Sequence, residues 1–177
     1  MAATVVIGLR ARTGAAEMIA IAPGPAFVAR SHFALATDGA EYCYHAAAEM
    51  TLAHAKRHVA KARDVAKAHA LAALRPFVLD YEVRRAAVVR GKGKPLPELD
   101  AIVKVHALWH AAEGELYRDA LDAACAELGV AVIGVPQPEL AAPAAALAAL
   151  GKAAGKPWTV EQKEAAMAAL LALDSIR

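Results

Sequence analysis

Two histidines and a glutamate in the second half of the chain have a spacing that could support chemistry. His106, His110 and Glu113 stand at i, i+4 and i+7, which places them on one face of a helix. Imidazole and carboxylate groups on one face can ligate Zn²⁺ or act as an acid/base pair. The protease-type His-Glu-x-x-His motif is absent, because Ala107 occupies its glutamate position. Apolar side chains share this face, so half-buried histidines with Glu113 hydrogen-bonded to one of them are the simpler interpretation.

A second group of ionisable residues lies earlier in the chain. Glu41, His45 and Glu49 have i, i+4 and i+8 spacing if a helix begins early in that region, whereas Asp38 and Gly39 form a predicted turn. A relocated catalytic site would therefore draw on the following residues: His45, Glu49, His106, His110 and Glu113. No metal or cofactor is predicted, with Mg²⁺ or Zn²⁺ as the alternative. A Ser-centred nucleophile elbow, a Walker loop and a dinucleotide-binding glycine motif are all missing from the sequence.

Positive charge is concentrated in the first part of the chain. Residues 1–105 hold 15 Lys and Arg against 9 Asp and Glu, whereas residues 106–177 hold 5 against 9. The first part is therefore the better candidate to meet an anion. The net charge of +2 falls well short of that of a dedicated non-specific DNA-binding protein.

One predicted helix carries much of this positive charge. Eight potential cations lie within 16 residues, with Asp64 as the one acid among them: His54, Lys56, Arg57, His58, Lys61, Arg63, Lys67 and His69. Such a row could follow a nucleic-acid backbone, with Arg57, Lys61 and Lys67 as candidate contacts. The cations occupy more than one helical face and no aromatic residue is interleaved, so a solvated helix surface is the simpler interpretation.

Strands and helices must position these groups, and the hydrophobic pattern predicts them. Three apolar runs near the N-terminus predict consecutive antiparallel strands over residues 4–11, 15–22 and 26–36. A long helix follows from about Tyr44 to Leu74 and ends before Pro76. A strand near residues 83–89 then leads into a Gly/Lys/Pro loop.

The second half is predicted to contain three helices and one strand. One helix runs over residues 99–128, with a bend at Gly114 as an option and Gly129 at its end. The run "VAVIGV" predicts a buried strand, followed by an Ala-rich helix over residues 140–150. A last helix begins with a capping box formed by Thr159 and Gln162 and continues to about residue 173.

This order, βββαβαβα plus a C-terminal helix, predicts an α/β fold with a mixed five-stranded sheet and helices on both faces. The 177 residues are expected to form a single domain, with residues 155–177 packed on it as the C-terminal helix. The two cysteines are far apart and fit no metal or redox spacing, so free thiols are expected. With no leader-like or membrane-spanning run, a soluble cytoplasmic protein without a membrane partner is predicted.

The predicted order, together with two short motifs, resembles the ribonuclease H-like superfamily, in particular its RuvC-type resolvase and endonuclease V branches. "VIGLRARTG" is similar to the family's first strand, with Arg10 in the place of the first catalytic aspartate. "VVRGKG" resembles the endonuclease V strand that ends in Asp-Gly-x-Gly, with Arg90 in the place of the acid. The likeness spans most of the chain, and the order of the motifs is stronger evidence than either motif alone.

The resemblance implies a nuclease fold whose metal site has become cationic. Enzymes of this superfamily hold two Mg²⁺ ions with carboxylates, whereas a guanidinium cannot ligate Mg²⁺. Arg10 and Arg90 are expected to lie near each other and to bind an anion, with Lys92 and Lys94 adding charge. The simpler alternative is that both arginines end in solvent or pair with acids such as Glu82.

Three functions remain open from the sequence. The first is a non-catalytic ribonuclease H-like domain that binds nucleic acid or another phosphate-bearing ligand. The second is a nuclease or other phosphodiester hydrolase with the relocated His/Glu site. The third is a scaffold, because Ala-rich helices allow close packing between copies and would support a homodimer.

Overall fold

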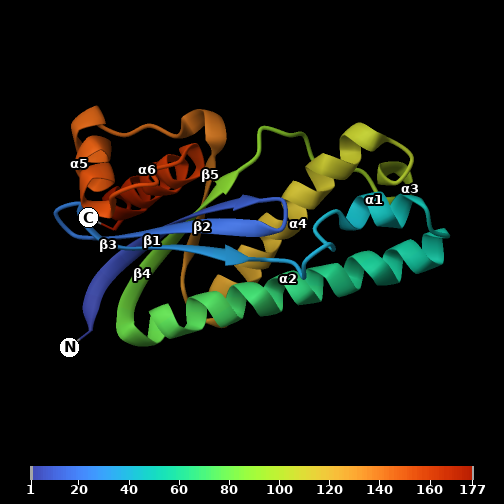
Figure 1. Cartoon of the computed structure of the whole chain (residues 1–177), viewed down its shortest axis with the longest axis horizontal. Helices are drawn as coiled ribbons and strands as arrows, with labels where there is room; N and C mark the ends of the chain where they lie inside the picture. Colours follow the sequence, from blue (N-terminus) through green and yellow to red (C-terminus); the bar gives the residue numbers. More distant parts are fainter. Residues whose placement is uncertain (1, 177) are drawn as a thin grey trace.

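The computed structural model of the chain describes residues 2–176. Its centre is a five-stranded sheet, which is twisted (Figure 1). The strands are β1 (Ala3–Arg12), β2 (Ala15–Ala22), β3 (Ala26–Ala34), β4 (Tyr81–Arg90) and β5 (Val132–Pro136). Their order across the sheet is β3-β2-β1-β4-β5. The first three strands pair antiparallel, and β4 and β5 join β1 in parallel. The predicted mixed five-stranded sheet is confirmed.

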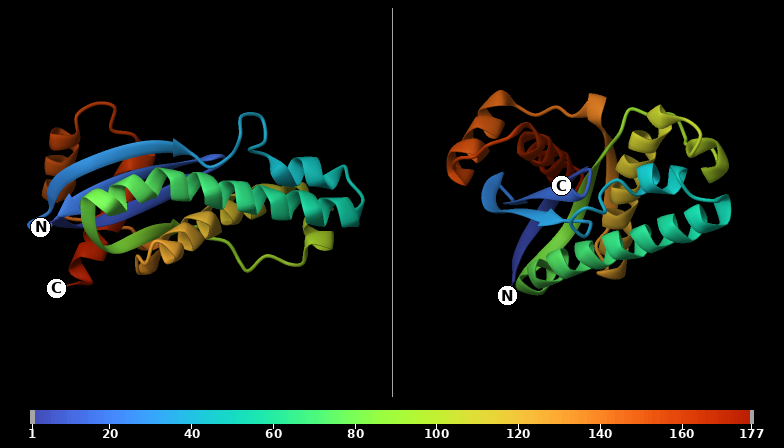
Figure 2. Two further views of the ribbon diagram at one scale, coloured as in Figure 1. Left: turned by 90° about the horizontal axis from the view of Figure 1, so that it is seen from below. Right: turned by 45° about the vertical axis from the view of Figure 1, so that its right-hand side comes forward.

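Helices cover both faces of this sheet (Figures 1 and 2). The helices are α1 (Cys43–Ala48), α2 (Leu52–Asp80), α3 (Leu99–Ile102), α4 (His106–Glu127), the 3-10 turn η1 (Gln137–Glu139), α5 (Ala144–Ala154) and α6 (Val160–Asp174). α2 and α4 pack on one face, and α6 packs on the other with α5 beside it. None of the helices within residues 2–176 is long and apolar enough to cross a membrane.

The alternation of β1 divides the core between the two faces. Ile7 and Leu9 pack toward α2 and α4, whereas Val6 packs toward α6. Gly8 faces α6 as well, and a Cβ at this position would lie 1.8 Å from the Ala165 carbonyl oxygen. The glycine therefore lets the backbone of α6 lie directly on the first strand.

The prediction of one helix ending before Pro76 is wrong in two respects. The helix is interrupted at residues 49–51, where Thr51 caps α2 by accepting a hydrogen bond from the His54 N–H. α2 then continues through Pro76 to Asp80. Phe77 beyond the proline packs against the core and stacks on Tyr81 with ring centroids 4.5 Å apart, so tertiary contacts outweigh the missing backbone hydrogen bond.

The predicted helix over residues 99–128 is two helices, separated at residues 103–105, and α4 continues through Gly114 without ending there. The space beside Gly114 is filled by the Arg118 guanidinium, 3.2 Å from where a Cβ would lie. β5 is a half-exposed edge strand in which Val135 alone is buried, so its prediction as a buried strand is also wrong.

Several local predictions at helix ends are confirmed. Thr159 and Gln162 form the capping box at the start of α6. Gly129 lies just after α4 with φ of +72°, as expected for the residue that ends a helix. The predicted bounds of α5 are wrong, because the helix begins at Ala144, after Pro143, and ends at Ala154. Both cysteines are free and buried, and burial raises the pKa of each thiol to about 12.

Candidate functional site

The carboxyl ends of the three parallel strands share one edge of the sheet. β1 ends at Arg12, β4 at Arg90 and β5 at Pro136, so the residues singled out on the first and fourth strands lie at this edge. Open α/β sheets usually bind ligands there, because the loops that leave the strands diverge and leave a crevice. The positions of the individual side chains decide what this edge can hold.

Arg10 projects from β1 toward α6 and forms an ion pair with Glu164. The second oxygen of Glu164 accepts a hydrogen bond of 2.6 Å from the Gln137 side-chain amide. The Arg10 side chain is 21% exposed and that of Glu164 11%. The pair therefore ties β1 to the first turns of α6 in a half-buried setting.

Arg90 projects from the opposite face of the sheet, toward α4, where it forms an ion pair with Asp122. The neighbouring residues of β4 show which face each side chain occupies, since Val88 packs toward α4 and Val89 packs toward α6. The expectation of one anion held between Arg10 and Arg90 is therefore wrong. Glu82, the acid named as an alternative partner, forms an ion pair with Arg84 and not with Arg10 or Arg90.

A cleft of about 710 Å³ lies between the loop after β4 and the outer side of α4. Arg90, Lys92 and Lys94 line the loop side. Arg118 lines the helix side, where its guanidinium lies 2.7 Å from Glu115. Within residues 2–176, neither Lys92 nor Lys94 forms an ion pair with a carboxylate. The cleft thus carries two uncompensated ammonium groups.

Asp119 also lines this cleft, one turn along α4 from Glu115. Burial raises the pKa of its carboxyl, and the nearby charge of Glu115 raises it further. Arg63 and Arg90 act in the opposite direction but do not cancel the effect. This carboxyl therefore holds its proton to a higher pH than an isolated aspartate does, and once ionised it offsets part of the positive charge of the loop.

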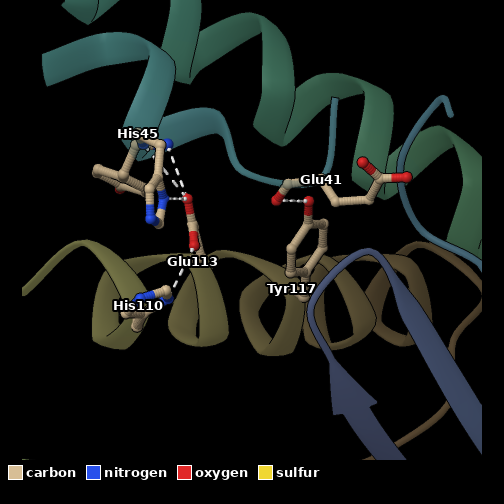
Figure 3. Close-up of polar contacts among 6 residues, drawn as sticks. Glu41, His45, His110, Glu113 and Tyr117 are labelled. Atoms are coloured by element: carbon tan, nitrogen blue, oxygen red, sulfur yellow. Dashed lines mark hydrogen bonds and ion pairs between the residues drawn. The ribbon is translucent and has the colours of Figure 1, made fainter. Parts of the chain in front are cut away.

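The histidine cluster lies where α1 meets the first turns of α4 (Figure 3). Glu113 is fully buried, and its Oε1 accepts hydrogen bonds from the Tyr44 N–H at 3.2 Å and from His45. The His45 Nδ1 lies 2.9 Å from the same oxygen. The Glu113 Oε2 is buried without a hydrogen-bond partner among the described residues and lies 3.7 Å from the His110 Nδ1.

Three imidazoles lie close together here, and two of them, those of His45 and His110, approach the Glu113 carboxylate. The ring centroid of His45 lies 5.3 Å from that of His106 and 4.7 Å from that of His110. One nitrogen from each of the three rings lies within 4.8 Å of the others. Sequence spacing grouped His106, His110 and Glu113, and the predicted relocated site also included His45, which joins them from a separate helix.

The other predicted residues lie elsewhere. Glu49 is exposed at the C-cap of α1 and takes no part in the cluster. Glu41 precedes α1, and its backbone carbonyl accepts a 2.7 Å hydrogen bond from the Tyr117 hydroxyl (Figure 3). On α2, Arg57 and Lys61 are exposed, whereas Lys67 lies 2.7 Å from Glu127 on α4.

Comparisons with known proteins add evidence on the fold. The sequence matches no protein-family model and no curated protein sequence. Two solved structures of RuvC from Thermus thermophilus are similar to this chain. One, in complex with a Holliday junction substrate, has a TM-score of 0.53 at 18% identity and covers 94% of this chain and 90% of its own. The other has a TM-score of 0.52 at 16% identity and covers 94% and 91%.

Proposed function

We propose that this chain, which has the ribonuclease H-like fold seen in RuvC, is a non-catalytic domain that binds nucleic acid through phosphate contacts. The observation that carries the proposal is the cationic cleft at the carboxyl edge of the parallel strands. Lys92 and Lys94 lie on a loop there and have no carboxylate partner within residues 2–176. Exposed ammonium groups in a crevice attract phosphate, and the attraction weakens with salt.

The loop that holds these lysines suits a phosphate backbone. Gly91 and Gly93 flank Lys92; the main chain at Gly93 is open to a ligand, since nothing lies within 4 Å of where a Cβ would be, whereas the Arg118 guanidinium lies beside Gly91. A volume of about 710 Å³ falls in the range of small-molecule sites. The Thermus RuvC structure contains a Holliday junction substrate, which favours nucleic acid over a free phosphate compound as the partner.

The ion pairs of Arg10 and Arg90 argue against cleavage by a two-metal mechanism. Arg10 is ion-paired with Glu164 and Arg90 with Asp122, so each of these two carboxylates already has a guanidinium partner. Within residues 2–176 the one group of three metal-ligating side chains is the histidine cluster, and it contains no carboxylate. A pair of Mg²⁺ ions requires several carboxylate oxygens in one place.

A binding assay tests this proposal. Fluorescence anisotropy with labelled single-stranded, duplex and four-way-junction DNA, repeated over a range of salt concentrations, gives affinity and salt slope. The Lys92→Ala/Lys94→Ala variant is expected to bind at least about tenfold more weakly, with a salt slope reduced by about 2. The control, Lys152→Ala/Lys156→Ala, removes the same charge from exposed positions around the end of α5. Equal affinity of the two variants would contradict the proposal.

A second candidate function is a phosphodiester hydrolase at the histidine cluster. It is favoured by the convergence of His45 and His110 on the buried carboxylate of Glu113, as an acid/base site requires. Turnover of generic phosphodiester and ester substrates, lost on His45→Ala, would support it. Equal rates with wild type and variant would exclude it. Self-association through the Ala-rich helices stays a prediction that a light-scattering mass can test.

A further inference from the structure

We propose that His45, His106 and His110 form a binding site for a divalent transition metal of the Zn²⁺ class. The inference stands apart from the nucleic-acid proposal, because it concerns a different group of side chains and is tested with the metal alone. The three histidines come from two elements, α1 and the first turns of α4, and one nitrogen of each lies within 4.8 Å of the other two.

The geometry needs only a small closure to hold an ion. Nitrogens bound to a tetrahedral Zn²⁺ at ordinary bond lengths lie about 3.3 Å apart, so the imidazoles must approach by roughly 1.5 Å. His106 and His110 are exposed, and rotation about their side-chain bonds can supply this movement without disturbing the core. His45 is held more firmly, since Glu113 contacts both its ring and its backbone N–H.

Glu113 provides an independent observation that points to a metal. Its side chain is fully buried, and its Oε2 has no hydrogen-bond partner among the described residues although it faces the cluster. A buried carboxylate oxygen left without a partner is costly. Metal-ligating histidines commonly give their second ring N–H to such a carboxylate, which fixes the ring and raises its basicity.

The hydrogen bonds assign the ring nitrogens. The Nδ1 of His45 donates to Glu113 Oε1 at 2.9 Å, which leaves its Nε2 free to bind the ion. The Nδ1 of His110 lies 3.7 Å from Glu113 Oε2, and a small approach as the cluster closes would bring this oxygen its missing donor. Glu113 is therefore a positioning residue for two of the ligands.

The ligand set selects the class of metal. Three neutral imidazoles suit Zn²⁺, Co²⁺, Ni²⁺ or Cu²⁺, whereas Mg²⁺ and Ca²⁺ prefer oxygen ligands. No fourth His, Cys, Asp or Glu joins the three within residues 2–176, which leaves at least one coordination position for water. Trp109 packs edge-on against His45 at 5.1 Å and forms an apolar wall on one side.

Calorimetric titration of tag-free protein with ZnCl₂, together with the visible spectrum of the Co²⁺-loaded protein, tests the proposal. Wild type is expected to bind one ion per chain, with Co²⁺ bands typical of a four- or five-coordinate nitrogen site. The His106→Ala/His110→Ala variant is expected to lose at least about tenfold in affinity along with these bands. Both side chains are exposed, so the variant should fold, which circular dichroism will verify.

His54→Ala/His58→Ala is the matched control, because it removes another i, i+4 histidine pair, on α2, that could bind metal by itself. This control should keep the wild-type affinity. Glu113→Gln keeps the size of the side chain but weakens the acceptor, and it should lower the affinity by about 10- to 100-fold with the stoichiometry unchanged. Failure of wild type to bind, unchanged binding by His106→Ala/His110→Ala, or equal loss in the control would overturn the proposal.

Discussion

Arg10 and Arg90 lie near the carboxyl ends of adjacent parallel strands, yet their guanidinium groups project from opposite faces of the sheet. Arg10 binds Glu164 on α6, and Arg90 binds Asp122 on α4. The strand register fixes this arrangement, because Leu9 pairs with Val88 and side chains alternate between the two faces. Each arginine thus joins the sheet to the helix layer on its own side.

The Arg10 ion pair should contribute to stability through its partner. Arg10→Met leaves the Glu164 carboxylate, 11% exposed, without its guanidinium, and we expect the free energy of unfolding to fall by about 1–3 kcal/mol. Arg10→Met/Glu164→Gln removes the uncompensated charge as well and should recover part of this loss. Urea unfolding of the three proteins measures both changes. If the double variant were no more stable than Arg10→Met, the uncompensated charge would not be the cause.

Gly8 should tolerate no side chain. In Gly8→Ala the new Cβ would lie 1.8 Å from the Ala165 carbonyl oxygen and 2.6 Å from the Ala169 nitrogen, so the backbone of α6 must move. We expect a loss of about 3 kcal/mol or more in the free energy of unfolding. Gly93→Ala, which meets nothing within 4 Å, is the control and should change stability by less than about 0.5 kcal/mol. Similar losses in thermal unfolding of both variants would contradict this packing argument.

Much of this fold could be predicted from the sequence because local signals and pattern agree. Strand β2 has the predicted bounds, and the capping box at Thr159 lies where it was expected. The errors arise where tertiary contacts determine whether a helix continues past a residue that usually ends or bends it. Pro76 lies inside α2 since Phe77 stacks on Tyr81, and Gly114 lies inside α4 beside Arg118.

The candidate site was harder to predict for a similar reason. Spacing along one helix can group His106 with His110 and Glu113, since they share a face. It cannot reveal that His45, more than sixty residues earlier, packs against them, because that contact depends on where α1 is placed. Likewise the opposite directions of Arg10 and Arg90 follow from the register of β1 against β4, which the sequence does not state.

The acid in the cleft gives a pH-dependent prediction. Burial and the charge of Glu115 raise the pKa of Asp119 above its ordinary value of 3.8. Because the pKa of this carboxyl is higher in the folded chain than in the unfolded chain, its proton favours folding at pH values below the unfolded-state pKa. This contribution to stability is lost as the pH rises through the folded-state pKa. At neutral pH the ionised Asp119 is therefore unfavourable. Asp119→Asn should be more stable than wild type there, and the difference should shrink as the pH falls toward 3.8.

Glu82 supplies a control of opposite sign. Hydrogen bonds from Thr4 and Arg84 lower the pKa of its exposed carboxyl below 4.5, so its contribution is present above that value and lost as pH falls through the folded value. Glu82→Gln should therefore be less stable than wild type at neutral pH and match it in acid. Urea unfolding at several pH values measures both variants. Parallel pH profiles for Asp119→Asn and wild type would mean that the Asp119 carboxyl has the same pKa in the folded and unfolded chain.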